Sequence, residues 1–87
     1  MKFCIDIPDY KGKGLSLVWE ENFILKARIG TKNENAIISG NSEGLISLAR
    51  HLLLLAQPNV SAGHHYHFDD LNSLEQGSCE LIIEKIN

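Results

Sequence analysis

The chain has 87 residues, of which 44% are hydrophobic and 22% are charged, and its formal net charge is −3. This length predicts a single domain spanning residues 1–87, and the apolar content argues against intrinsic disorder. Its eight Lys and Arg residues are scattered along the chain, which argues against nucleic acid as a partner because phosphate binding needs clustered positive charge.

The first half of the chain predicts a meander of antiparallel strands, because apolar and polar residues alternate there at a period of two. The predicted strands span residues 3–7, 15–20, 23–29 and 36–39. Segments rich in Gly, Asn and other turn-forming residues separate them at 8–14, 21–22 and 30–35.

A helix is predicted next, because the apolar spacing changes to three or four residues at Leu45, Leu48, Ala49, Leu52, Leu55 and Ala56. Asn41 or Ser42 is the expected N-cap, and Gln57–Pro58 is expected to end the helix. His51 is expected at the rim of the apolar stripe. Two further strands are predicted at 64–69 and 79–86.

These elements predict an α+β fold of order β-β-β-β-α-β-β, with a single antiparallel sheet of about five or six strands and one main helix packed on one face. The covered face would hold Phe3, Ile5, Leu17, Trp19, Phe23, Leu25, Tyr66, Phe68, Leu81 and Ile83. The open face would hold Val18, Ile24, Lys26, Arg28, His65, His67, Asp69, Glu80, Ile82 and Glu84. Its apolar members, Val18, Ile24 and Ile82, would allow a homodimer through this face.

The most conspicuous cluster of polar residues is Gly63–Asp70, which holds three of the four histidines. On a strand, His65, His67 and Asp69 would point to the same side, a pattern that permits a metal site or a small ligand-binding module without specifying either. Because histidine titrates near pH 6.5, the pair His65 and His67 could instead make a binding surface sensitive to mild acid.

No arrangement of residues predicts catalysis or a bound cofactor. Ser, Cys and His are present, but no strained turn places a nucleophile, and the paired carboxylates Asp69–Asp70 and Glu20–Glu21 would point apart on a strand. We therefore predict that the protein is not an enzyme and carries no cofactor.

Three segments of the second half resemble the immunity protein 32 family: Glu43–Leu52, Gly63–Asp69 and Leu71–Lys85. The block Asn72–Lys85 is the most specific of these, and the resemblance covers roughly residues 40–86. The family comprises small bacterial α+β proteins of polymorphic toxin systems. The resemblance implies a non-catalytic protein that binds and occludes a cognate protein toxin, and it supplies no catalytic residues.

Partner-binding residues are expected on the open face and in the segment that follows it, at His65, His67, Asp69, Asp70 and Glu75. An acidic rim there would complement a basic toxin surface. A cytoplasmic location is expected, because Asp6 and Pro8 interrupt the start of the chain before a signal-like apolar run forms. The longest apolar run, Leu52–Ala56, is too short to cross a membrane, and Cys4 and Cys79 are expected to stay reduced.

Overall fold

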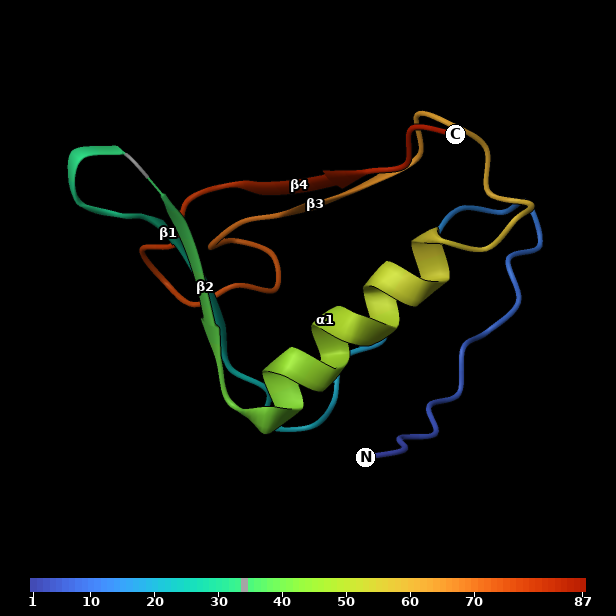
Figure 1. Ribbon diagram of the computed structural model, residues 1–87, viewed down its shortest axis with the longest axis horizontal. Helices are drawn as coiled ribbons and strands as arrows, with labels where there is room; N and C mark the ends of the chain where they lie inside the picture. The colour runs from blue at the N-terminus through green and yellow to red at the C-terminus, as the bar shows by residue number, and fades with distance from the viewer. Residues whose placement is uncertain (34) are drawn as a thin grey trace.

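The computed structural model describes residues 1–33 and 35–87, so Glu34 of the predicted turn at 30–35 lies outside the described residues. The elements, in order, are β1 (Leu25–Ile29), the 3-10 turn η1 (Thr31–Asn33), β2 (Ala36–Gly40), α1 (Ser42–Leu55), β3 (His65–Phe68) and β4 (Leu81–Glu84). They form two antiparallel hairpins, β1–β2 and β3–β4, which lie on one side of α1 (Figure 1).

The α+β class is confirmed, but the single sheet of five or six strands is wrong, because each hairpin forms its own two-stranded sheet. The backbone that precedes β4 occupies the outer edge of β1. The Glu75 N–H donates to the Leu25 carbonyl at 2.9 Å, and the Cys79 N–H donates to the Ala27 carbonyl at 2.9 Å. This irregular segment takes the position beside β1 that another strand would have filled.

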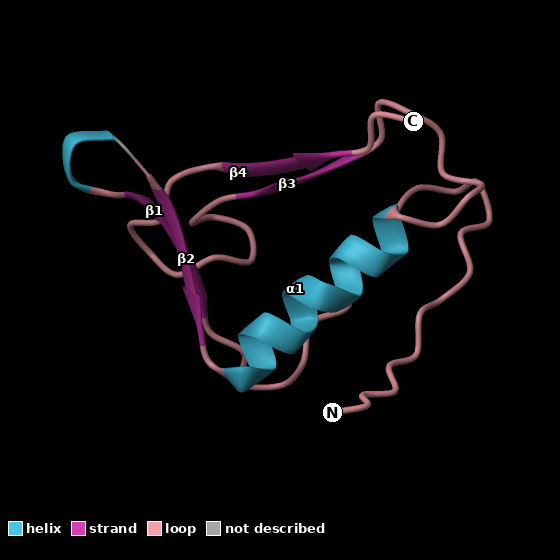
Figure 2. Ribbon diagram, in the orientation of Figure 1, coloured by secondary structure: helices cyan, strands magenta, loops and turns pink. Residues whose placement is uncertain are grey.

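The predicted strands at 3–7 and 15–20 do not form, and residues 1–24 are drawn as loop (Figure 2). For residues 15–20, side chains of α1 explain why, since they bind backbone N–H groups that a strand would offer to its neighbour. His51 Nε2 accepts from the Val18 N–H at 3.1 Å, and Ser47 Oγ accepts from the Glu20 N–H at 2.8 Å. The alternating segment at 15–20 is therefore fixed to the helix and not to a sheet.

The helix is confirmed, with Asn41 as its N-cap. Asn41 Oδ1 accepts from the Gly44 N–H and from the Ile24 N–H, both at 2.8 Å, so one side chain starts the helix and fixes the chain entering β1. The helix ends at Leu55, before Pro58. The predicted strands at 23–29, 36–39, 64–69 and 79–86 form as β1, β2, β3 and β4, with shorter bounds than predicted except for β2.

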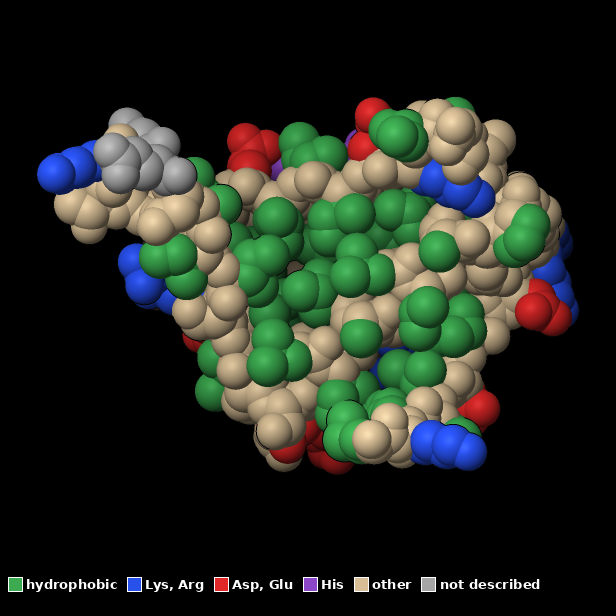
Figure 3. Space-filling view, in the orientation of Figure 1, with side chains coloured by type: hydrophobic (Ala, Val, Ile, Leu, Met, Phe, Trp, Pro, Cys, Tyr) green, Lys and Arg blue, Asp and Glu red, His purple; other side chains and the backbone are tan. Residues whose placement is uncertain are grey.

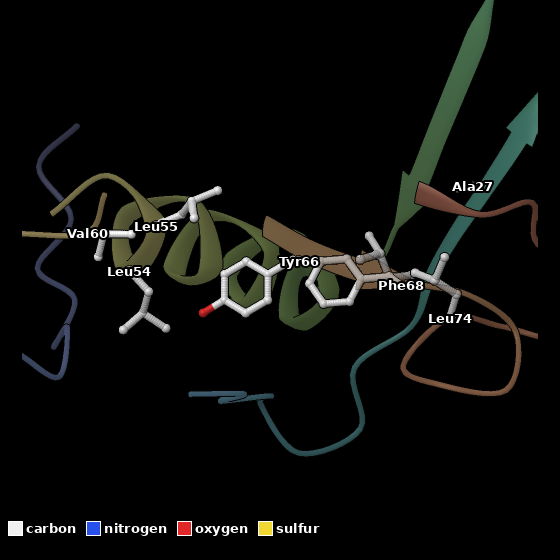
Figure 4. Packing of buried hydrophobic residues seen from close by; sticks show 8 residues of the cluster. Ala27, Leu54, Leu55, Val60, Tyr66, Phe68 and Leu74 are labelled. Atoms are coloured by element: carbon white, nitrogen blue, oxygen red, sulfur yellow. The ribbon is translucent and has the colours of Figure 1, made fainter. Parts of the chain in front are cut away.

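The core lies between α1 and the two hairpins and draws on both halves of the chain. Its buried apolar members are Leu25, Ala27, Leu54, Leu55, Val60, Tyr66, Phe68 and Leu74. Tyr66 and Phe68 of β3 point the same way into it, with residues of α1 at one end and Leu74 at the other (Figure 4). The rings of Tyr66 and Phe68 are stacked, with centroids 5.3 Å apart.

His51 is fully buried in this core, so its predicted place on the rim of the helix is wrong. Its ring lies against Trp19 and Tyr66, with centroids 4.2 and 5.0 Å away. Its Nδ1 donates to the Ser47 carbonyl at 2.6 Å, while Nε2 accepts from Val18. The side chain is tolerated there because both ring nitrogens are hydrogen-bonded, as a buried polar group requires.

The predicted faces hold for the formed strands and only in part for the segments that are not strands, where Trp19 and Phe23 pack against the core as expected. Leu25, Tyr66 and Phe68 are buried as expected, whereas Phe3 and Leu17 are 57% and 53% exposed. Val18, predicted on the open face, is half-buried and packs against the core. Ile24, just before β1, and Ile82 of β4 remain exposed, so the three do not make the continuous face that the predicted homodimer needs.

Two further properties bear on the expected location. Within residues 1–33 and 35–87, no helix is long and apolar enough to cross a membrane. Cys4 is exposed and Cys79 is half-buried, and both are free thiols.

Candidate functional site

The outer side of the β3–β4 hairpin carries the polar residues that the alternation predicted. His65 and His67 are exposed, while Tyr66 and Phe68 between and after them are buried. The register places Glu84 opposite His65 and Ile82 opposite His67. Because directly opposed residues of a hairpin lie on the same side of the sheet, β3 and β4 build this outer surface together.

His67 is the centre of the closest polar contacts on this surface. Its Nε2 lies 2.7 Å from Glu80 Oε1 and 3.8 Å from Asp69 Oδ2. Since the imidazole is 45% exposed, the ring is oriented by these carboxylates and still reaches solvent.

Two of the predicted site residues also shape the loop that joins β3 to β4. Asp69 Oδ1 accepts from the Leu71 N–H at 3.0 Å, and Asp70 Oδ2 accepts from the Gly77 N–H at 3.3 Å. Glu75 differs from them, because its side chain is exposed and makes no hydrogen bond or ion pair with any described residue. Its carboxylate is free to meet a partner.

The negative charge of the protein is concentrated in this region. Residues 51–84 contain no Lys or Arg and five acidic residues: Asp69, Asp70, Glu75, Glu80 and Glu84. The rest of the chain has eight Lys and Arg against six Asp and Glu, a net charge of +2. We call these five carboxylates, with His65 and His67, the acidic hairpin surface.

Two members of this surface, Glu80 and Glu84, were not among the predicted site residues. The alternation placed both on the open face, but only the strand register reveals that they lie beside the histidines. A shallow groove next to β3 was also missed, since it depends on where the chain from residue 15 to 17 comes to rest. Its lining includes Leu15, Leu17, His64, His65, His67 and Asn72.

The geometry does not favour a metal centre. Within the described parts of the chain, no three or more His, Cys, Asp or Glu side chains are placed to hold a metal ion. His65 Nδ1 instead lies 3.2 Å from the Gly63 carbonyl of its own loop. Metal binding by His65, His67 and Asp69 stays a prediction without support from the arrangement of these side chains.

Comparison with known protein families gives a match to the second half of the chain. The model of a protein family described as immunity protein 32 matches residues 36–86, more than half of the chain, which confirms the resemblance found in the sequence. The matched segment contains β2, α1 and the β3–β4 hairpin. No curated protein matches the chain, and no solved structure does.

Proposed function

Because the chain belongs to the immunity protein 32 family, we propose that it is a non-catalytic immunity protein that binds a cognate bacterial protein toxin and blocks it by occlusion. The acidic hairpin surface is the proposed contact. It would meet a basic region of the toxin, of the kind that binds the phosphates of a nucleic-acid substrate. Neutralisation would then need no chemistry from this protein, only occupation of that region.

The concentration of charge is the observation that carries this proposal. Five carboxylates without an intervening Lys or Arg occupy residues 69–84, while the remainder of the chain has a net positive charge. Complementary fields steer two proteins together and raise the association rate above the neutral range of about 10⁵–10⁶ M⁻¹s⁻¹. A fast association rate suits an inhibitor that must capture a toxin before it acts.

Within this surface the residues are proposed to have different roles. Glu75, Glu80 and Glu84 are exposed and would supply the attraction. Asp69 and Asp70 hold the loop in shape through the Leu71 and Gly77 N–H groups, so substituting them would change the loop as well as the charge. His65 and His67 would contact the partner beside the groove along β3.

The experiment begins with a tagged pull-down from the native bacterium, with bound proteins identified by mass spectrometry. The recovered partner is then titrated by surface plasmon resonance against the wild type and the triple variant Glu75→Lys, Glu80→Lys, Glu84→Lys. The control reverses the same number of exposed acidic residues in the N-terminal segment: Asp6→Lys, Asp9→Lys and Glu21→Lys. Both variants change the net charge equally.

We expect the hairpin variant to lose at least about tenfold in association rate, with a flatter dependence on salt. The control should stay close to the wild type. Equal losses in both variants would mean that only the overall charge matters. Unchanged binding in the hairpin variant would place the toxin elsewhere. In a cell assay, co-expression of the hairpin variant should fail to rescue growth from the toxin.

A further inference from the structure

One face of the molecule leaves the core incompletely covered. Hydrophobic side chains gather in the middle of the view in Figure 3, over α1 and in the space between the two hairpins. On α1, Leu45 and Leu52 are 49% and 43% exposed, and the face includes a groove lined by Leu52 and by Ile83 of β4. We call this the open core face: Ile38, Leu45, Leu48, Leu52 and Ile83.

Ile38 connects this face to the edge of the β1–β2 hairpin. It is paired with Ala27, which is buried, and opposed residues share one side of a sheet. The side chain of Ile38 therefore points to the core side, yet it is 42% exposed. Its exposure follows from its position on β2, which lies at the outer edge of the sheet.

The backbone of β2 also lacks a neighbour on that edge. The Gly30 N–H donates to the Asn35 carbonyl at 2.8 Å, and since hydrogen-bonded pairs alternate along an antiparallel ladder, Ile37 and Ser39 bond to β1. The N–H and C=O groups of Ala36, Ile38 and Gly40 point the other way. Among residues 1–33 and 35–87, nothing hydrogen-bonds to them. In Figure 1, β2 is drawn in front of β1, so this edge borders the open core face.

Such an edge is unusual in a soluble monomer. Proteins normally protect a free edge with charged residues, proline or a covering segment, because it otherwise pairs with another chain. The β2 sequence Ala-Ile-Ile-Ser-Gly contains neither a charge nor a proline. An unprotected edge beside an apolar face indicates a surface that is covered in the working protein.

We propose that β2 pairs antiparallel with β2 of a second copy, forming a two-fold symmetric homodimer that covers the open core face. Centring the two-fold axis on Ile38 places Ala36 of each copy opposite Gly40 of the other. The outward N–H and C=O groups then all face partners, because all three residues point to that edge. The two Ile38 side chains lie side by side on the core side and extend the apolar surface from one copy to the other.

The features of β2 favour a second copy over an unrelated protein. The strand is complementary to itself in hydrogen bonding, and having no charge it sets no like charges opposite each other, which would be destabilising.

The size of the contact requires the apolar face as well as the strand. A specific interface buries at least about 1,000 Å², more than a pair of five-residue edge strands provides alone. Leu45 lies near Gly40 at the end of β2, and it would supply the remaining apolar area together with Leu48 and Leu52 further along α1. Interfaces between permanent partners are rich in apolar area of this kind.

The test measures the mass of the full chain in solution by light scattering coupled to size exclusion, for the wild type and two variants. Ile38→Lys places two lysines side by side on the axis. Ile82→Lys makes the same change at a strand residue of similar exposure, 58%, on the outer side of the β3–β4 hairpin. We expect a dimer for the wild type and Ile82→Lys. Ile38→Lys should raise the dimer dissociation constant at least about tenfold while keeping the wild-type circular dichroism spectrum.

Hydrogen exchange of the wild type provides a readout that does not depend on the variants folding. The outward amides of Ile38 and Gly40 should exchange at least about tenfold more slowly at high protein concentration than at low concentration. A monomeric wild type at every concentration would overturn the proposal. So would a dimer that Ile82→Lys disrupts and Ile38→Lys does not, or exchange at these two amides that does not change with concentration.

Discussion

Replacing His51 with glutamine is expected to remove a specific pH dependence from the stability of the protein. In the fold, His51 Nε2 accepts a hydrogen bond from the Val18 N–H and therefore carries no proton. Burial lowers the pKa of His51, the bond to the Ser47 carbonyl opposes this in part, and the charge of Arg50 lowers it further. The buried imidazole stays neutral at pH values where an exposed one is protonated.

The size and sign of the effect follow from linkage. An unfolded histidine titrates near pH 6.5, so below that pH the unfolded chain binds a proton that the folded chain does not. The contribution of the neutral, buried His51 to the unfolding free energy is thus fully present above about pH 6.5 and is lost as the pH falls. While His51 stays neutral in the fold, lowering the pH from 7.5 to 5.5 costs about 1.4 kcal/mol of unfolding free energy.

The assay is urea unfolding at these two pH values, at one fixed protein concentration because self-association would also change stability. His51→Gln should be less stable at pH 7.5 by about 1–3 kcal/mol, since it loses the buried ring contacts and hydrogen bonds. The variant should also lose most of the difference in unfolding free energy between pH 7.5 and pH 5.5. His65→Gln, which changes an exposed histidine, is the control and should keep that difference. The reasoning fails if His51→Gln shows the full wild-type pH dependence.

Three further predictions concern single side chains. Asn41→Ala should lower the unfolding free energy by about 2 kcal/mol in urea titrations, because it removes the helix cap and leaves the Ile24 N–H without its acceptor; a loss below about 0.5 kcal/mol would contradict this role. Gly44→Ala should lower the melting temperature sharply, since its Cβ would lie 1.9 Å from the Ile24 carbonyl oxygen, whereas Ala49→Gly, at an exposed helix position, should cost only about 1 kcal/mol. Burial raises the pKa of Tyr66 to about 12, so stability should fall between pH 10 and 12 as the unfolded tyrosine loses its proton first; the late component of an absorbance titration should vanish in Tyr66→Phe.

The sequence predicted best those elements whose signals are local. The helix followed from its apolar spacing together with Asn41 and Pro58, and the cap geometry bears this out. The β3 strand followed from simple alternation, which separated exposed His65 and His67 from buried Tyr66 and Phe68. In both cases the residues that fix the element are neighbours in the chain, so the pattern alone carried the information.

The failures share a physical cause, which is competition for backbone hydrogen bonds. Alternation at 15–20 is compatible with a strand, but the N–H groups of Val18 and Glu20 are bound by His51 and Ser47 of α1. His51 looked like a polar rim residue because its type gives no sign that both nitrogens find partners in the core. These hydrogen bonds join residues 27 or more positions apart. The spacing of apolar residues along a strand or a helix contains no information about such contacts.

In the candidate site, too, local patterns predicted some residues, whereas others depend on contacts between distant parts of the chain. Alternation identified the side of β3 that faces solvent, but Glu80 and Glu84 joined the surface only through the register of β4. The loop carboxylates Asp69 and Asp70 looked equivalent to Glu75 in the sequence. Only the hydrogen bonds to Leu71 and Gly77 reveal that the first two have a structural task.

The two proposed surfaces lie on opposite sides of the β3–β4 hairpin. Odd and even positions of β4 separate them, because Ile83 is opposite the buried Tyr66 and Glu84 is opposite the exposed His65. A dimer formed through β2 would therefore leave the acidic hairpin surface of each copy free. Two toxin molecules could then bind one dimer, and charge reversal at Glu75, Glu80 and Glu84 should weaken toxin binding without changing the mass of the dimer. Ile38→Lys should do the reverse, so the two proposals can fail independently of each other.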